Sequence, residues 1–204
     1  MNAQPVRVVG AEPPPLDRAV RLGDELLLRA HPAPRPGDLL EAEFSIPAAR
    51  IATAPLTPRD LLGRLVVVST LPNIQKHACA AQIIDIEEHA PVVLPAPHIV
   101  HVSADEAHHW GEVDVFHGSV RAPGYSLCCA ESASREAFAR AFGVAVLGQR
   151  RVTHGLFALS GGVFVAVEIP FDQMQPPDVG AFLLRVRRLL DRIGRPRPEP
   201  FTTE

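Results

Sequence analysis

The chain has 204 residues, 47% of them hydrophobic, and a formal net charge of −3. This length and composition can bury one substantial core, so a single compact domain is expected. The near balance of acids and bases creates no broad positive field, and we therefore expect neither nucleic acid nor a membrane as partner. No apolar run approaches the roughly 20 residues of a membrane span, and prolines interrupt the N-terminal segment before a signal-peptide core can develop.

The cysteine content predicts a reducing compartment. Three cysteines are too few for a disulfide framework in a chain of this length, so free thiols and a cytoplasmic location are expected. The proline-containing segments 1–18 and 195–204 lack a periodic apolar pattern and are expected to be flexible tails. They would flank one domain over residues 19–194.

The first element, at residues 19–30, allows two interpretations. Leu16, Val20, Leu26 and Leu27 suit one face of a helix, whereas VRL and ELLL suit two short strands turning at Gly23-Asp24. We favour the β-hairpin.

The clearest strand signal is RLVVVSTL at residues 64–71, a short β-branched apolar run that Pro72 ends. Such a run is typical of a strand buried on both faces of a sheet. The following AAQIIDIEEHA predicts an amphipathic helix that begins near Cys79. Cys79 is thus expected at a helix start, directly after a central strand.

Further elements follow along the chain. Strands are predicted at 98–105 and 125–127, and GLFALS and VFVAVEI, which flank Gly161-Gly162, predict a hairpin. Capping residues place helices at 134–142 and 178–193. Strands alternating with helices in this way predict an α/β domain with a mixed central sheet covered by helices on both faces, the thioredoxin-like pattern.

Cys79 is the main candidate for chemistry. The unpaired N–H groups and positive dipole end of a helix start stabilise a thiolate, and nearby Lys76 and His77 would lower the pKa of the thiol further. The alternative is a buried cysteine with only a packing role.

The segment PNIQKHAC at 72–79 resembles the peroxiredoxin signature Pro-x-x-x-Thr-x-x-Cys, with the same spacing from Pro72 to Cys79. Other segments resemble landmarks of the thiol peroxidase subfamily in the same order: PGD, Phe44-Ser45, LTPRDLLGRLVVVSTLPN, VSAD and EAFARAFGV. The resemblance spans roughly residues 19–193. It implies a peroxiredoxin form of the thioredoxin-like fold, a homodimer, and reduction of hydrogen peroxide or small organic hydroperoxides through a peroxidatic Cys79.

This resemblance also implies that the chain needs no cofactor and that a thioredoxin-like or low-molecular-weight thiol regenerates it. Lys76 stands where the family has Thr, and His154 aligns with the family's active-site Arg. We expect Lys76 to stabilise the thiolate, His77 or His154 to polarise the peroxide, and Pro72 to shape the pocket.

The family's resolving cysteine would fall near Asp114, where no thiol is present. The only other thiols, Cys128 and Cys129, follow a predicted strand and are expected at the same sheet edge as Cys79. Either is a candidate for the resolving thiol, and two cysteines without redox work are the alternative.

Two other functions compete with the peroxidase. Replacement of the family's Thr, Arg and resolving Cys together would fit a degenerate redoxin-fold protein that senses, binds or scaffolds. A Cys/His metal site is the third reading, but no metal is expected because the candidate ligands form no compact motif: Cys79, His77, His98, His101, His108, His109, His117 and His154.

Overall fold

The computed structural model describes residues 16–63, 65–112 and 120–193. Most of the expected tails, and the segment that holds Asp114 and His117, lie outside the described residues. The helices are α1 (His77–Val93), α3 (Ser132–Ala141) and α4 (Val179–Ile193). The strands are β1 (Ala19–Leu22), β2 (Glu25–Leu28), β3 (Ala48–Arg50), β4 (Leu65–Leu71), β5 (His98–Ser103), β6 (Gly124–Ser126), β7 (Gly155–Ser160) and β8 (Val163–Glu168). Among the described residues, no helix is both long and apolar enough to cross a membrane.

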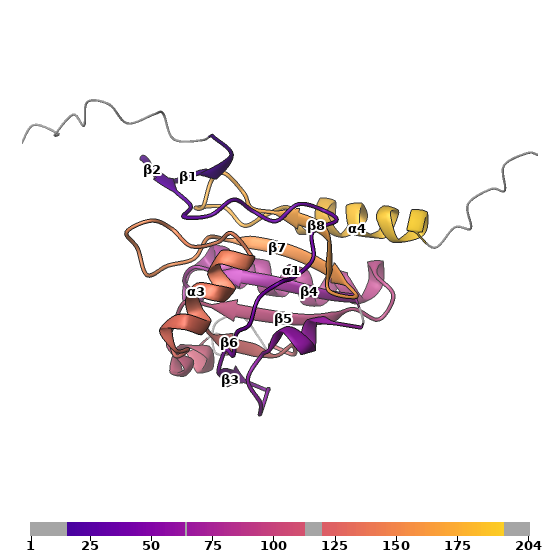
Figure 1. The fold of residues 1–204 in the computed structure, drawn as a ribbon, viewed down its shortest axis with the longest axis horizontal. Helices are drawn as coiled ribbons and strands as arrows, with labels where there is room; N and C mark the ends of the chain where they lie inside the picture. Colours follow the sequence, from indigo (N-terminus) through magenta and orange to yellow (C-terminus); the bar gives the residue numbers. More distant parts are fainter. Residues whose placement is uncertain (1–15, 64, 113–119, 194–204) are drawn as a thin grey trace, which may run out of the picture.

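The main sheet has the strand order β3-β6-β5-β4-β7-β8 and mixes parallel with antiparallel pairs (Figure 1). β4 lies near its centre, parallel to β5 and antiparallel to β7. All seven β4 residues are buried, as the β-branched run predicts. The strand predicted at 64–71 is therefore confirmed over its described part.

Side chains alternate between the two faces of β4, and each face has its own helices. Val66 and Val68 belong to one cluster with Phe138 of α3 and its C-cap residue Phe142, and α3 lies in front of the sheet in Figure 1. Leu65 and Val67 belong to a second cluster, which contains residues of α1 and α4. The predicted mixed sheet with helices on both faces is confirmed.

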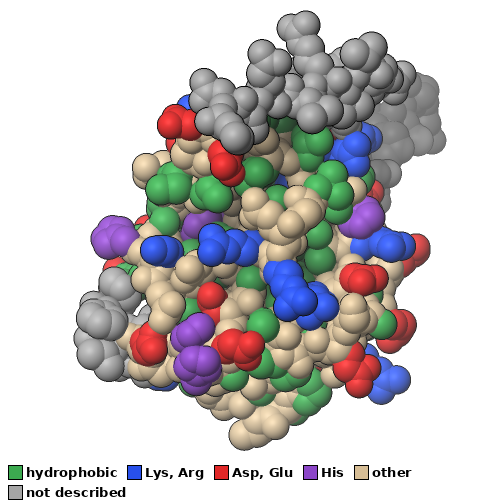
Figure 2. Space-filling model, turned by 90° about the vertical axis from the view of Figure 1, so that its left-hand side faces the viewer, with side chains coloured by type: hydrophobic (Ala, Val, Ile, Leu, Met, Phe, Trp, Pro, Cys, Tyr) green, Lys and Arg blue, Asp and Glu red, His purple; other side chains and the backbone are tan. Residues whose placement is uncertain are grey.

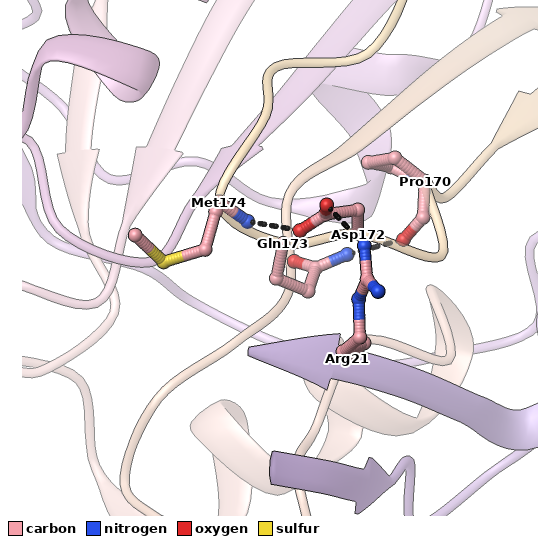
Figure 3. A network of polar contacts seen from close by, with 5 residues as sticks. All are labelled: Arg21, Pro170, Asp172, Gln173 and Met174. Carbon is pink, nitrogen blue, oxygen red and sulfur yellow. Dashed lines mark hydrogen bonds and ion pairs between the residues drawn. The ribbon is translucent and has the colours of Figure 1, made fainter. Parts of the chain in front are cut away.

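The N-terminal residues form the predicted hairpin rather than a helix. β1 and β2 pair antiparallel, and Gly23 adopts the positive φ of 61° that the tight turn requires. The hairpin lies along residues 170–174, here called the strap: the Arg21 N–H donates to the Phe171 carbonyl, and the Gln173 N–H donates to the Arg21 carbonyl. A 2.7 Å ion pair between Arg21 and Asp172 adds to this pairing (Figure 3).

Candidate active site

Sheet topology brings His154 to Cys79. Because β7 runs antiparallel to β4 with Gly155 opposite Thr70, His154 lies beside the end of β4, where the chain turns into α1. His154 precedes Leu156 by two residues and so faces the α1 side of the sheet with it. Cys79 is the third residue of α1, and its Sγ lies 3.7 Å from His154 Nε2.

Gln82 is the third member of this group. It lies one helical turn after Cys79 on the same face of α1, and its Oε1 lies 2.7 Å from His154 Nδ1. The Gln82 amide nitrogen donates to the Gly155 carbonyl at 3.2 Å and to Ser69 Oγ at 2.8 Å. A carbonyl oxygen only accepts hydrogen bonds, so the contact with the Gly155 carbonyl shows which end of the Gln82 amide is the nitrogen. His154 therefore carries its proton on Nδ1 and presents the lone pair of Nε2 to the thiol of Cys79.

The strap holds the backbone of the same histidine. The His154 N–H donates to Gln173 Oε1 at 2.6 Å. The Gln173 amide nitrogen in turn donates to the Pro170 carbonyl within the strap, as Figure 3 shows. The site thus depends on three segments distant in sequence: α1, the start of β7 and the strap.

Burial keeps the Cys79–His154 pair neutral. Burial raises the pKa of the Cys79 thiol to about 12; a backbone hydrogen bond from Asn73 opposes this rise, and the Asp105 carboxylate adds to it. Burial lowers the pKa of His154 to about 4. The expectation that the pKa of Cys79 is lowered to give a thiolate is therefore wrong, because removal from water outweighs the helix start.

Asp105 positions the loop that carries Cys79. Its carboxylate accepts the Ile74 N–H at 2.6 Å and the Ser103 hydroxyl at 2.5 Å. Ser103 ends β5, so this contact ties the loop before α1 to the neighbouring strand. The VSAD segment thus has a structural role beside the site.

Cys79 and His154 line a cavity of about 760 Å³, and Pro72, Lys76 and His77 line it too. The structure therefore brings all five predicted catalytic residues to one place. Lys76 is the N-cap residue of α1 with an exposed side chain, and His77 is also exposed. The pKa of Cys79 depends instead on burial, on the Asn73 backbone and on Asp105.

Most of the cavity wall is apolar, and the N-terminal hairpin contributes Val20, Leu22 and Leu27 to it. Lys76, His77 and Arg151 are basic lining residues, and none of the described lining residues is acidic. The face at the left of Figure 1, where the hairpin lies, carries a band of Lys and Arg side chains (Figure 2). An apolar molecule with a negative group matches this lining.

The two candidate resolving thiols lie on the surface. Cys128 Sγ is 3.1 Å from one Glu106 oxygen and Cys129 Sγ is 3.3 Å from the other, and both residues are exposed. The hydrogen bond to Glu106 raises the pKa of Cys128 to about 11, and burial adds to the rise. All three cysteines are free thiols, and the hydrogen bonds of the described residues join Cys79 to His154 but Cys128 and Cys129 to Glu106.

The other histidines have separate settings. His101 is buried, and its Nε2 lies 3.3 Å from Glu87 Oε1, which ties β5 to α1. Burial raises the pKa of Glu87, but His101 and two backbone N–H groups outweigh burial and leave this pKa lowered. The rings of His108 and His109 contact each other. In the described part of the chain, no three His, Cys, Asp or Glu residues are placed to hold a metal ion.

Sequence reasoning missed Gln82 and Gln173. The signal for Gln82 was available: it is a polar residue within the buried stripe of α1 that contains Cys79, Ile83 and Ile86. Gln173 carried no such signal, because only the fold of the strap brings it to His154.

The fold is similar to that of several proteins whose structures have been solved. No protein-family model matches the chain, and no curated protein matches it by sequence. Solved structures do match. A thiol peroxidase from Chromobacterium violaceum superposes with a TM-score of 0.68 at 16% identity, over 88% of this chain and 99% of that one. A peroxiredoxin-like protein from Aquifex aeolicus gives 0.64 at 14% identity, over 84% and 97%. AhpC from Enterococcus faecalis gives 0.63 at 18% identity, over 79% and 96%. The chain therefore has the peroxiredoxin form of the thioredoxin-like fold, as the sequence predicts.

Proposed function

We propose that the chain is a thiol-dependent peroxidase that reduces hydrogen peroxide or small organic hydroperoxides through Cys79. The observation that carries this proposal is the 3.7 Å approach of Cys79 Sγ to the proton-free nitrogen of His154 in a mostly apolar cavity. A base at this position removes the need for a preformed thiolate. The solved structures of similar fold, among them a thiol peroxidase, support the proposal.

The reaction needs only groups that the site contains. Cys79 Sγ attacks one peroxide oxygen, the S–O bond forms and the O–O bond breaks. His154 Nε2 accepts the thiol proton and passes it to the departing oxygen, which leaves as water or an alcohol. Sulfur is oxidised by two electrons to a sulfenic acid, and the peroxide is reduced by two.

A second thiol must then restore Cys79. We propose that Cys128 or Cys129 condenses with the sulfenic acid, which releases water and forms a disulfide. Because Cys79 is buried and this pair is exposed, the step requires local opening of the loops around the site. A thioredoxin-like or low-molecular-weight thiol would reduce the disulfide. The proposal includes a homodimer in a reducing, cytoplasmic compartment, and sedimentation would test the oligomeric state.

The test is the rate of Cys79 sulfenylation by stoichiometric hydrogen peroxide and by tert-butyl hydroperoxide, followed by disulfide mapping. Cys79→Ser is the negative control, and His154→Gln should slow the reaction by roughly 100-fold because the base is lost. A native rate equal to that of free cysteine would reject the peroxidase.

A second candidate is a redoxin-fold protein that binds or senses without turnover. The neutral thiol favours it, because burial raises the pKa of Cys79 to about 12 and no fixed cation replaces the family's Arg in contact with Sγ among the described residues. The same rate measurement separates the two functions, since this candidate predicts that Cys79 stays reduced.

A further inference from the structure

Cys79, His154 and Gln82 form a connected series of nucleophile, base and orienting group. The first contact is 3.7 Å and the second is 2.7 Å, and Gln82 is itself held by Ser69 and Gly155. A thiol, an imidazole and a side-chain amide in this order form one of the arrangements by which enzymes attack acyl carbons. The peroxide reaction proposed above uses the same base, and the complete series also supplies the groups that acyl transfer needs.

The charge state of the pair suits acyl transfer. Both groups are neutral at neutral pH, because both are buried. His154 can take the thiol proton as Sγ attacks and return it to the departing oxygen, which an ester needs because an alkoxide leaves poorly without a proton. Gln82 keeps Nε2 free for both transfers by holding the proton on Nδ1.

Backbone donors lie beside the nucleophile. The Ala80 N–H makes a hydrogen bond to the Lys76 carbonyl, so the N–H groups of Ala78 and Cys79 precede it in the first turn and have no acceptor four residues earlier within the helix. Ala78 and Cys79 both line the cavity. An acyl oxygen that develops negative charge there would lie next to N–H groups and the positive end of α1.

The cavity defines the substrate class. A volume of about 760 Å³ with walls from Val20, Leu22 and Leu27 accommodates an apolar acyl chain. Lys76 and Arg151 are the charged partners available to a negative group, and no acid opposes them among the described lining residues. An ester that joins an apolar acyl chain to an anionic leaving group matches both features.

We propose that this site also hydrolyses esters of apolar carboxylic acids whose leaving group carries a negative charge, with Cys79 as nucleophile, His154 as base and Gln82 as positioning residue. The S–C bond forms and the C–O bond breaks, so the alcohol leaves with the proton from His154 and the acyl group remains as a thioester. Water then attacks the thioester, His154 accepts the water proton and returns it to Sγ, and the free acid leaves. No redox partner is needed, since no atom changes oxidation state.

The experiment uses the full chain and two octanoyl esters: 4-nitro-3-octanoyloxybenzoate, which is anionic, and neutral p-nitrophenyl octanoate. Release of the nitrophenolate gives the rate, and peptide mass spectrometry locates the octanoyl group. We expect label on Cys79, turnover beyond one equivalent, and roughly 100-fold slower acylation in His154→Gln. Arg151→Gln should lower the ratio of anionic to neutral ester rates.

Controls separate this inference from the peroxidase. Cys79→Ala reports acylation of lysines and of the exposed thiols, and circular dichroism shows whether each variant folds. Equal acylation of Cys79 in the native chain and in His154→Gln would overturn the proposal, as would a release that stops at one phenolate per chain. Sulfenylation by peroxide is read on the same preparations by a different mass shift, so failure of one activity can be told from failure of the other.

Discussion

Gln82 Oε1 accepts a 2.7 Å hydrogen bond from His154 Nδ1 and thereby decides which nitrogen of the ring faces Cys79. The contact joins two neutral groups, so the thiol has a base beside it but no ion pair. A charged side chain at position 82 should therefore change the protonation of both Cys79 and His154.

Gln82→Glu should convert the neutral pair toward a thiolate and an imidazolium. A carboxylate against Nδ1–H raises the pKa of His154, and the resulting cation lowers the pKa of Cys79. Alkylation of Cys79 by iodoacetamide at pH 7 should become about tenfold faster, which corresponds to about one pKa unit. Peptide mass spectrometry over time measures it.

Two variants test the reason for this change. Gln82→Met removes the acceptor without adding charge and should slow alkylation, while Gln149→Glu adds a carboxylate at an exposed residue of the cavity lining and should have little effect. Equal rates in Gln82→Glu and Gln82→Met would show that Gln82 does not control the charge of the pair.

His154 should make the fold less stable in mild acid. Its pKa is lowered from 6.5 to about 4 by burial, so the unfolded chain binds the proton more readily. The contribution of the neutral ring to stability is present above pH 6.5 and is lost as the pH falls toward 4. Between pH 7 and 5 the free energy of unfolding should drop by about 2 kcal/mol from this residue.

Urea unfolding at pH 7, 6 and 5 measures this loss. His154→Gln cannot titrate, and the other histidines are common to both chains, so the difference between the two pH slopes isolates His154. Parallel slopes would mean that His154 is as easily protonated in the folded as in the unfolded chain.

The effect of a carboxylate on a thiol pKa can be tested separately at the surface residue Cys128. Glu106 accepts a hydrogen bond from Cys128 and raises the pKa of this thiol. Glu106→Gln should therefore make the reaction of Cys128 with a disulfide reagent at pH 8 several-fold faster, since more thiolate is present. Glu131→Gln, which changes another exposed carboxylate nearby in sequence, is the matched control. An unchanged rate in Glu106→Gln would show that Glu106 does not hold the thiol proton.

The sequence could predict the fold because its strongest patterns are local. The run at 65–71 and the turn at Gly23 determine β4 and the hairpin almost alone, and the apolar spacing of AAQIIDIEEHA predicted a helix that begins near Cys79. The state of the thiol could not be predicted in this way. Whether Cys79 is charged depends on its burial and on the distance to Asp105 and His154, which only the folded chain determines.

The roles of Gln82 and Gln173 could not be predicted from local sequence patterns either. Each is one amide among many in the sequence, and each gains its role from a partner more than 15 positions away: His154 for both. A buried polar residue in an apolar helical stripe could have drawn attention to Gln82. For Gln173 the pairing of the strap with β1 is decisive, and a hairpin and a loop after β8 give no local sign that they will meet.

Gln173 should matter more to the fold than its neighbour Asp172, although Asp172 makes the ion pair. The Gln173 side chain accepts the N–H of buried His154, so Gln173→Leu leaves that donor unpaired and should cost about 1–3 kcal/mol of unfolding free energy. The Arg21–Asp172 pair is largely open to water, which screens it, so Asp172→Asn should change stability little.

Urea unfolding of both variants, together with the rate of Cys79 alkylation, measures the two effects. Because the displaced backbone of His154 moves its ring relative to Sγ, the alkylation rate should change in Gln173→Leu and stay near native in Asp172→Asn. The reverse order of either quantity would mean that the strap is held to the hairpin by its ion pair and that His154 is positioned by Gln82 alone.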